Sequence, residues 1–534
     1  MTARQGWASI PAMTADAEAF GDQLAVVDGT TRLTYAGLVE RARAFGAALV
    51  ASGIQAGDRV AIWCGNSAEW VIAALGLWEA GATLVPVNTR FKGAEAADIL
   101  GRSRARALVT VTDFLGTDYV AMLRASGAEL PDLTTVVVAR STPDAGAVGW
   151  DDFLGRAGTS AREEMARRAA ATGPDDPADI LFTSGTTGRP KGVVQTHART
   201  LCVSTDWAQM VGLTRDDRYL MVNPYFHMFG LKAGILTSVG VGLTMFPMAV
   251  FDVQRVLETV ERERITVLPG APTVYQSILD FPRRDAYDLS SLRAAVTGAA
   301  DIPVELIRRV RAELPLTTVI AGYGLTEAGT ATATSPDDDP ETVATTVGHA
   351  RPTFELRVIG PDGEEVPLGA PGEVVLRGGS VMLRYLDDPA STAEVLSPDG
   401  WLRTGDVGML DERGNLRIVG RSKDMYIVGG FNAYPAEIEN ILLRHPDIER
   451  AAVIGIPDER LGEVGMAFVV PRAGSSPTPD AIIEWSRGEM ANYKVPRAVE
   501  LVEALPYNAT GKVAKAELRA LAAARGRGAA PAKN

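Results

Sequence analysis

Hydrophobic and polar residues alternate along the first part of the chain as they do where strands and helices follow one another. A helical period with an apolar face begins near Thr34, and the apolar run 59–63 predicts a buried strand. Residues 66–80 return to a helical period, and 83–87 form a second apolar run. Strands that alternate with helices of this length indicate βαβ units and mainly parallel sheets.

The same alternation continues through the middle of the chain. No short internal repeat is present, which excludes solenoids and propellers. The fold class that we predict is therefore α/β, a large N-terminal body of several subdomains. Further short apolar runs predict strands at 107–111, 135–138, 179–182, 265–268 and 294–296.

The pattern changes near residue 420 to that of a small α+β domain. Helical periods are found at 436–443 and 479–490, and strand-like runs at 451–456 and 466–470. About a hundred residues are enough for a separate domain. We therefore predict four parts: a body at 1–420, a hinge at 421–424, a C-terminal lid domain at 425–520 and a frayed tail at 521–534.

Composition and charge narrow the class of protein. The chain has 534 residues, of which 46% are hydrophobic and 22% charged, as in ordinary globular proteins. A formal net charge of −13 repels nucleic-acid phosphates, so we expect no nucleic-acid partner. Two cysteines and four histidines make neither a disulfide framework nor a zinc-type cluster, which fits a reducing cytoplasm.

No segment reads as a signal peptide or a membrane span. The first twenty residues lack a basic region followed by an apolar one. Residues 233–251 carry no charge, but three glycines and Pro247 interrupt them. We expect a buried helix, a turn and a strand there, and a cytoplasmic protein without a membrane span.

A loop rich in glycine and hydroxyl residues follows the predicted strand at 179–182. Its three glycines let backbone N–H groups approach an anion, and Lys191 supplies a mobile positive charge suited to a polyphosphate. It is not a Walker A loop, because Pro190 and Gly192 flank the lysine. The candidate phosphate-binding residues are Thr183, Ser184, Gly185, Thr186, Thr187, Gly188 and Lys191.

This loop resembles the phosphate-binding signature of the adenylate-forming enzymes, which include acyl-CoA synthetases, peptide adenylation domains and firefly luciferase. The other signatures of that family follow in the expected order, and the resemblance covers the chain except its tail. They are 323–327 (YGLTE), 404–406 (TGD), 420–424 (GRSKD) and 508–512 (NATGK).

The resemblance implies a site for ATP. Tyr323, followed by Gly324, would stack on adenine, Thr326 would bind the α-phosphate, and Glu327 would hold Mg²⁺, which prefers carboxylate and phosphate oxygens. Asp406, expected on a tight turn, would accept the ribose hydroxyls, and Arg421 would orient the nucleotide. The small residues that would line the nucleotide and acyl pocket are Gly298, Ala299 and Ala300.

Three further positions would serve the chemistry and the motion of the lid. Lys512 would bridge the carboxylate and the α-phosphate, where an ammonium offsets the repulsion between two anions. Lys423 would be the pivot about which the lid rotates between the two half-reactions. Gly429 and Gly430 resemble the loop that lines the pantetheine tunnel of coenzyme A.

The acid would enter beside the aromatic segment 223–230. His227 matches the residue that gates the acyl pocket in the family. Lys232 follows in an otherwise apolar stretch. Two interpretations stay open for it: a helix start that faces water, or a contact with a polar group of the substrate.

The resemblance implies ATP-dependent activation of a small-molecule carboxylic acid through an acyl-adenylate, then transfer to coenzyme A. Segments 223–236, 265–276 and 288–293 resemble the ligases that attach CoA to the bicyclic propanoate left from steroid ring degradation. Pocket residues diverge readily in this superfamily. Activation of another acid, such as nitrite for diazotisation, stays open.

The acceptor that we expect is CoA, with a separate carrier protein as the alternative. No carrier domain follows Lys512, and no long insertion of the kind found in fatty-acyl-AMP ligases precedes the hinge. A third reading, a nucleotide-binding module without catalysis, would not need the bridging lysine. A homodimer is common among relatives, although no segment singles out an interface.

Overall fold

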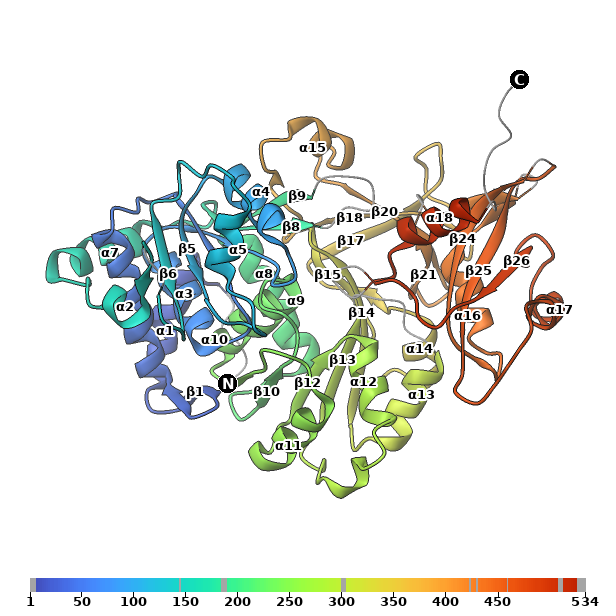
Figure 1. Cartoon of the computed structure of the whole chain (residues 1–534), viewed down its shortest axis with the longest axis horizontal. Helices are drawn as coiled ribbons and strands as arrows, with labels where there is room; N and C mark the ends of the chain where they lie inside the picture. Colours follow the sequence, from blue (N-terminus) through green and yellow to red (C-terminus); the bar gives the residue numbers. More distant parts are fainter. Residues whose placement is uncertain are drawn as a thin grey trace.

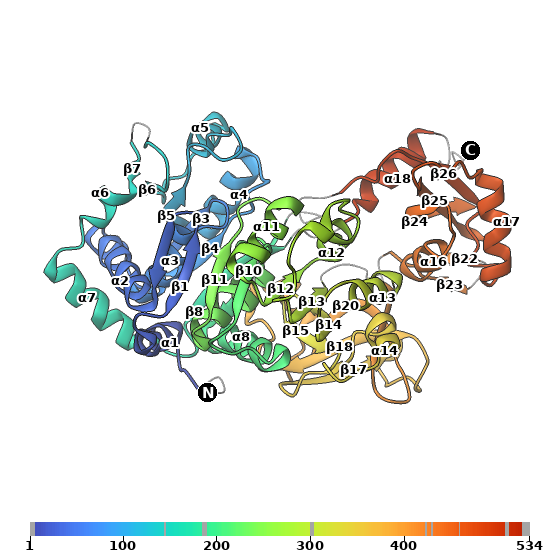
Figure 2. The same ribbon diagram turned by 90° about the horizontal axis from the view of Figure 1, so that it is seen from below.

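The computed structural model describes residues 6–143, 146–183, 190–298, 304–421, 424–428, 431–458, 460–507 and 512–525. A large body carries the N-terminal and middle parts of the chain, and the C-terminal strands and helices (orange to red) form a smaller unit at one end (Figures 1 and 2).

One sheet of the body has a mainly parallel centre. Its order is β16-β15-β14-β13-β12-β10-β11-β1-β2, and its central strands β11, β10, β12, β13 and β14 run parallel. The carboxyl ends of these strands therefore lie at one edge, where ligands bind in open α/β sheets. The strands are β1 (Leu24–Asp28), β2 (Thr31–Thr34), β10 (Arg218–Met221), β11 (Thr244–Pro247), β12 (Val267–Gly270), β13 (Ala294–Gly298), β14 (Thr318–Leu325), β15 (Gly329–Ala333) and β16 (His349–Ala350).

Amphipathic helices cover this sheet. Apolar residues of four of them, α11, α12, α13 and α14, pack with side chains of β12, β13 and β14 in one core. The following helices belong to this region: α11 (Val253–Glu263), α12 (Pro272–Leu279), η3 (Arg284–Ala286), α13 (Val304–Glu313) and α14 (Pro340–Thr345).

The second sheet of the body has the order β19-β9-β8-β4-β3-β5-β6-β7. Strands β8, β4, β3, β5, β6 and β7 are parallel, whereas β9 and β19 pair antiparallel at its edge. The strands are β3 (Arg59–Trp63), β4 (Thr83–Pro86), β5 (Ala105–Thr110), β6 (Thr135–Val138), β7 (Val148–Gly149), β8 (Pro177–Thr183), β9 (Lys191–Thr196) and β19 (Arg384–Tyr385).

Helices lie on the second sheet and between the two sheets. The largest core cluster joins them and includes the fully buried Trp63, Trp70 and Trp78. Helix α8 contacts β8 and β9 of one sheet and β15 of the other. The helices are α1 (Ile10–Ala17), η1 (Glu18–Phe20), α2 (Tyr35–Ala51), α3 (Ala68–Glu79), α4 (Gly93–Ser103), α5 (Tyr119–Ala125), α6 (Trp150–Leu154), α7 (Thr159–Ala171), α8 (His197–Val211), α9 (Met228–Gly230), the π-helical turn η2 (Leu231–Leu236), α10 (Thr237–Val241) and α15 (Pro389–Val395).

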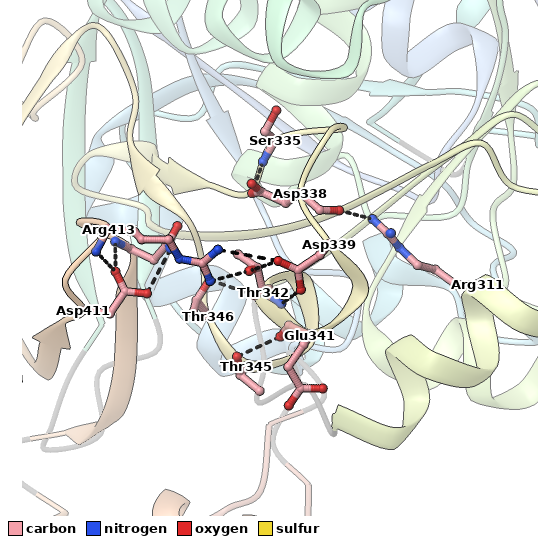
Figure 3. Close-up of polar contacts among 11 residues, drawn as sticks. Arg311, Ser335, Asp338, Asp339, Glu341, Thr342, Thr345, Thr346, Asp411 and Arg413 are labelled. Carbon is pink, nitrogen blue, oxygen red and sulfur yellow. Dashed lines mark hydrogen bonds and ion pairs between the residues drawn. The ribbon is translucent and has the colours of Figure 1, made fainter.

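An antiparallel sheet completes the body, in the order β17 (Phe354–Ile359), β18 (Gly372–Gly378), β20 (Leu402–Leu410) and β21 (Leu416–Arg421). Figure 3 shows how its β20–β21 turn is tied to α14. The guanidinium of Arg413 donates to Thr342 Oγ1 at 2.8 Å and lies 3.6 Å from Asp339. Asp339 in turn caps α14 by accepting from the Thr342 N–H. These bonds fix the sheet that carries Asp406 against the one that carries Tyr323.

The C-terminal unit is a sheet with helices beside it. Strand β25 lies between β24 and β22, and β26 also pairs with it. Its elements are β22 (Tyr426–Val428), β23 (Phe431–Ala433), α16 (Pro435–Leu442), β24 (Ile448–Asp458), β25 (Gly462–Pro471), α17 (Pro479–Glu489), β26 (Ala498–Leu501) and α18 (Lys515–Ala524).

The predicted fold class is confirmed: a large α/β body with mainly parallel sheets is followed by a C-terminal α+β domain. Residues 233–251 form a buried helix, a turn at Gly242 and the strand β11, as expected. Within the described ranges, no helix is both long and apolar enough to cross a membrane. The limits given above for the body, hinge, lid and tail stay predictions.

Candidate active site

The predicted phosphate-binding loop is closed by a hairpin. Strand β8 ends at Thr183 and β9 begins at Lys191, and these two residues face each other across the antiparallel pair. The loop therefore returns into a strand, whereas a Walker A loop leads into a helix. Ser184, Gly185, Thr186, Thr187 and Gly188 lie outside the described residues.

Lys191, Glu327 and Tyr385 form the first polar cluster. Tyr385 OH donates to Glu327 Oε1 at 2.9 Å, and the Lys191 ammonium lies 4.9 Å from the centre of the Tyr385 ring. Burial raises the pKa of Glu327, and it also raises the pKa of Tyr385, with the Glu327 charge acting in the same direction. The cluster places a carboxylate and an ammonium beside the end of the β8–β9 hairpin, where phosphate binding is predicted.

Tyr385 has no motif in the sequence that marks it as a site residue. The pairing of β19 with β9, in which Tyr385 faces Val193, brings it to the site. A pairing between strands so distant along the chain leaves no local pattern to detect.

Tyr323, Asp406 and Arg421 form the second polar cluster. Tyr323 OH donates to Asp406 Oδ2 at 2.6 Å, and Arg421 Nε lies 3.0 Å from Asp406 Oδ1. Burial, followed by the charge of Asp406, raises the pKa of Tyr323 well above its usual value. The sequence led us to expect Asp406 on a tight turn. The residue lies instead inside β20, where it is in register with Arg421 of β21.

Both clusters contain a residue of the segment 323–327: Glu327 belongs to the first cluster and Tyr323 to the second. Tyr323 and Gly324 belong to the end of β14, and Thr326 and Glu327 lie in the turn that leads to β15. Gly298, at the end of β13, is in register with Gly322, and a Cβ there would lie 2.6 Å from the Gly322 carbonyl oxygen. Only glycine allows the two strands to approach so closely. Ala299 and Ala300 lie outside the described residues.

His227 of the body lies within electrostatic reach of Lys512 of the C-terminal unit. Burial lowers the pKa of His227 to about 4, and the positive charge of Lys512 adds to the shift. His227 Nδ1 accepts from the Phe229 N–H at 3.2 Å, so the neutral ring carries its proton on Nε2. Lys512, just before α18, is exposed on the C-terminal unit. The roles expected for the two residues, gating the acyl pocket and bridging the carboxylate and the α-phosphate, stay predictions.

Asn66 shapes the segment that carries His227, and the sequence analysis did not identify it. Its Nδ2 donates to the carbonyls of Met221 at 3.0 Å and Asn223 at 2.9 Å, and its Oδ1 accepts from the Tyr225 N–H at 2.9 Å. Asn66 is buried after β3, in the other sheet. A single polar residue after an apolar strand gave no indication of these three bonds.

Lys232 contradicts both interpretations offered for it. Its side chain is only 1% exposed, and its Nζ lies 3.0 Å from Asp179 Oδ1, which is fully buried. The lysine therefore neither faces water nor turns its charge toward the substrate. It is held in a buried ion pair with the strand that leads to the phosphate-binding hairpin.

Three predicted positions of the hinge region, Lys423, Gly429 and Gly430, lie outside the described residues. Asp424, the last residue of the predicted hinge, pairs with Arg519 of α18 at 3.2 Å. Lys515, at the start of the same helix, pairs with Glu439 of α16 at 2.9 Å. The helix that follows Lys512 is thus linked by ion pairs to Asp424 and to α16.

Comparison with known proteins assigns the class. The family model "AMP-binding enzyme" matches residues 13–386, and "AMP-binding enzyme C-terminal domain" matches residues 437–512. An anthranilate CoA ligase, AuaEII, in complex with anthranoyl-AMP has the same fold, with a TM-score of 0.88 and 28% identity over 98% of this chain and 100% of that one. ATP-bound MatB from Rhodopseudomonas palustris aligns with a TM-score of 0.83 and 30% identity, over 96% and 99% of the two chains.

Two curated relatives are more similar in sequence. Both are named "3-[(3aS,4S,7aS)-7a-methyl-1,5-dioxo-octahydro-1H-inden-4-yl]propanoyl:CoA ligase". The one from Rhodococcus jostii is 50% identical over 506 residues, and the one from Mycobacterium tuberculosis is 49% identical over 501. Each alignment covers 94% of this chain and 96% of the relative.

The fold is that of the adenylate-forming enzymes. The chain belongs to the AMP-binding enzyme family, and the resemblance noted in the sequence is confirmed. The predicted activity class is confirmed as well: an AMP-forming acid–CoA ligase that uses ATP and CoA and activates a small-molecule acid. A dimer, a carrier protein and the cytoplasmic location stay predictions.

Proposed function

We propose that the acid is a propanoate carried on a bicyclic, oxygenated ring system, and that it is joined to CoA through its acyl-adenylate. The observation that carries the proposal is identity of about one half, over nearly the whole chain, to two ligases named for such an acid. The polar clusters described above supply residues for each part of the reaction.

The nucleotide would bind across the second cluster. Asp406 is 5% exposed, and each of its oxygens keeps accepting capacity beside Tyr323 and Arg421, so it can take the ribose hydroxyls. The hydroxyl of Tyr323 is held by Asp406, which fixes its ring as a face for adenine. Lys191 and Thr183, at the two ends of the hairpin, would meet the phosphates, together with Thr326.

Glu327 fits a Mg²⁺ ion bound together with ATP. Among the described residues, no group of three or more His, Cys, Asp or Glu is gathered as a metal site, but Mg²⁺ usually takes only one or two carboxylates beside substrate phosphates and water. Tyr385 occupies one oxygen of Glu327 and leaves accepting capacity for a cation. When bound, Mg²⁺ neutralises part of the phosphate charge.

The acid would lie between His227 and Lys512. The Nε2–H of neutral His227 can donate to the carboxylate without adding charge, and the Lys512 ammonium can contact both the carboxylate and the α-phosphate. A carboxylate oxygen attacks the α-phosphorus, the bond to the bridging oxygen breaks, and pyrophosphate leaves. No protein nucleophile takes part.

Thioester formation would follow rotation of the C-terminal unit about Lys423. Lys512 then withdraws, and the CoA thiol enters along Gly429 and Gly430. The thiol loses its proton to water, its sulfur attacks the acyl carbon, the bond between that carbon and the AMP oxygen breaks, and AMP leaves with the electron pair. The ion pair of Lys515 with Glu439 links α18 to α16, so Lys512, just before α18, would move with the unit.

The experiment is acid-dependent exchange of pyrophosphate into ATP without CoA, with bicyclic propanoates, aryl acids, alkyl acids and nitrite as the panel. We expect the bicyclic propanoates to exchange fastest, and CoA to convert the adenylate to a thioester. Faster exchange with another class would refute the proposed acid. Exchange that leads to no thioester with CoA would refute the acceptor and favour a carrier protein or another nucleophile.

A further inference from the structure

Lys232 carries a charge in the interior of the body. Its side chain and that of Asp179 are 1% and 0% exposed, and they form an ion pair of 3.0 Å. Burial lowers the pKa of Lys232, and the Asp179 charge opposes that shift. Buried charges of this kind are expensive to desolvate, and well-packed apolar residues of similar size often serve stability as well or better. Stability alone therefore does not account for the pair.

The lysine lies in the π-helical turn η2, directly after the segment that carries His227. A π-turn inside a helix is uncommon and is frequent at functional sites. The Lys232 carbonyl accepts from Thr237 Oγ1 at 2.9 Å, which also donates to the Ser204 carbonyl of α8. The backbone of Lys232 is thus bonded to Thr237, and its ammonium is paired with Asp179 of β8.

Asp179 connects this turn to the phosphate-binding hairpin. It lies on β8, which ends at Thr183, where the hairpin begins. Its second oxygen accepts from Thr200 Oγ1 of α8 at 2.5 Å, and Thr200 is fully buried. One carboxylate therefore holds β8, α8 and η2 together, and these elements carry the phosphate-binding end and the acid-binding end of the site.

We infer that Lys232 is a positioning residue: through Asp179 it fixes the turn η2, and so His227, relative to the strand that leads to the phosphates. The inference rests on the proposed function, because it assigns His227 to the acid. Near-attack geometry between two bound reactants depends on sub-ångström placement, so loosening η2 should affect the acid more than ATP.

The test separates positioning from stability with two variants. Lys232→Met alone leaves Asp179 buried without its partner and should lower Tm by about 10 °C. The double variant Lys232→Met/Asp179→Leu removes both charges and should recover most of that Tm. In the pyrophosphate-exchange assay, the acid KM of the double variant should stay about tenfold above that of the parent. Its ATP KM should stay within about twofold of the parent value.

A matched control comes from the pair of Arg293 and Asp217. Its atoms lie 2.6 Å apart, Asp217 is buried, and both residues precede the amino ends of strands, away from the edge that carries the site. Arg293→Met/Asp217→Leu should change Tm without changing the acid KM. Should the Lys232 double variant recover both Tm and the parent acid KM, the positioning role would be overturned.

Hydrogen exchange gives a readout that needs no substrate. In the Lys232 double variant, amides of residues 227–236 should lose protection while those of α11 exchange as in the parent. Unchanged protection of 227–236 would also overturn the inference. If the parent shows no exchange of pyrophosphate with any acid, the proposed function fails, and the amide measurement still decides the role of Lys232.

Discussion

The two sides of the site are held in different ways. On the nucleotide side, the residues that would touch ATP contact one another directly: Tyr323 and Arg421 both bind Asp406. On the acid side, His227 lies on a segment whose shape is set by residues that would touch no substrate. Asn66 bonds that segment at three backbone atoms, and Lys232 ties the following turn to Asp179.

The difference suggests how such a ligase can change its acid while it keeps its nucleotide. A charged cluster that binds a ligand directly tolerates little change. A segment whose shape is set by buried residues that touch no substrate can shift when those residues change slightly, because packed interiors transmit strain. The two sides should then respond separately to substitution.

Lys512→Ala should have the largest effect, because Lys512 is the one group assigned to both sides. We expect acid-dependent exchange to fall about 10²–10³-fold, as for loss of one preorganised group that stabilises transition-state charge. Transfer to CoA from supplied acyl-adenylate should fall far less. Lys494→Ala is the control, since Lys494 pairs with Glu437 of the same unit at 2.6 Å. Equal losses in both half-reactions would remove the bridging role.

Lowering the pH should destabilise the folded chain through a buried histidine. Burial lowers the pKa of His197, which starts α8, to about 4 from 6.5, and its Nδ1 accepts from the Ile10 N–H. The unfolded chain binds this proton first, so stability falls as the pH drops from 6.5 to 4, by about 3 kcal/mol for this group. Urea unfolding of His197→Asn should show a correspondingly smaller loss over that range. An unchanged pH dependence would contradict the assignment.

Asp406→Asn tests the nucleotide side. Loss of the charge weakens the bonds proposed to the ribose and the pairing with Arg421, so the ATP KM should rise about 10–100-fold. The acid KM should stay near that of the parent. Asp411→Asn is the matched control in the same hairpin, where Asp411 accepts from the N–H groups of Arg413 and Asn415 and from Asn415 Nδ2. A similar rise in the control would show that the hairpin, and not the carboxylate, is responsible.

Asn66→Ala should have the smallest effect, and on the acid side. It leaves two carbonyls and one N–H without their partner, which should cost about 1–3 kcal/mol of stability. The acid KM should rise about tenfold as the segment of His227 loosens. Ser67→Ala removes the neighbouring cap of α3 and should cost about 1 kcal/mol without changing the acid KM. An acid KM unchanged in Asn66→Ala would refute the role of Asn66 in shaping the segment of His227.

Much of the fold follows from the sequence because it rests on local patterns. The predicted strand 59–63 is β3, and the helical period at 66–80 contains α3, with Ser67 as its cap. The apolar runs at 135–138 and 294–296 fall in β6 and β13. Periodicity and caps report on neighbours along the chain, and these elements depend on little else.

The site was predictable only where a motif carries the ligand-binding group itself. The motifs at 404–406 and 420–424 carry Asp406 and Arg421, and these two residues are in register across β20 and β21. The turn that we expected at Asp406 was wrong, because the residue lies within β20. Tyr385, Asn66 and the partner of Lys232 could not be predicted, because each depends on a contact between distant segments. For Lys232 both interpretations were wrong, since a charge in an apolar stretch does not reveal a buried partner such as Asp179.

The most direct test of the separation is a double-mutant cycle on the two KM values. The variant Asp406→Asn/Asn66→Ala should show the ATP KM of the first substitution and the acid KM of the second, with the two effects adding to within about 0.5 kcal/mol. That result would mean that the nucleotide side and the acid side are held independently. A coupling well beyond that limit would contradict the account, because it would make them one network.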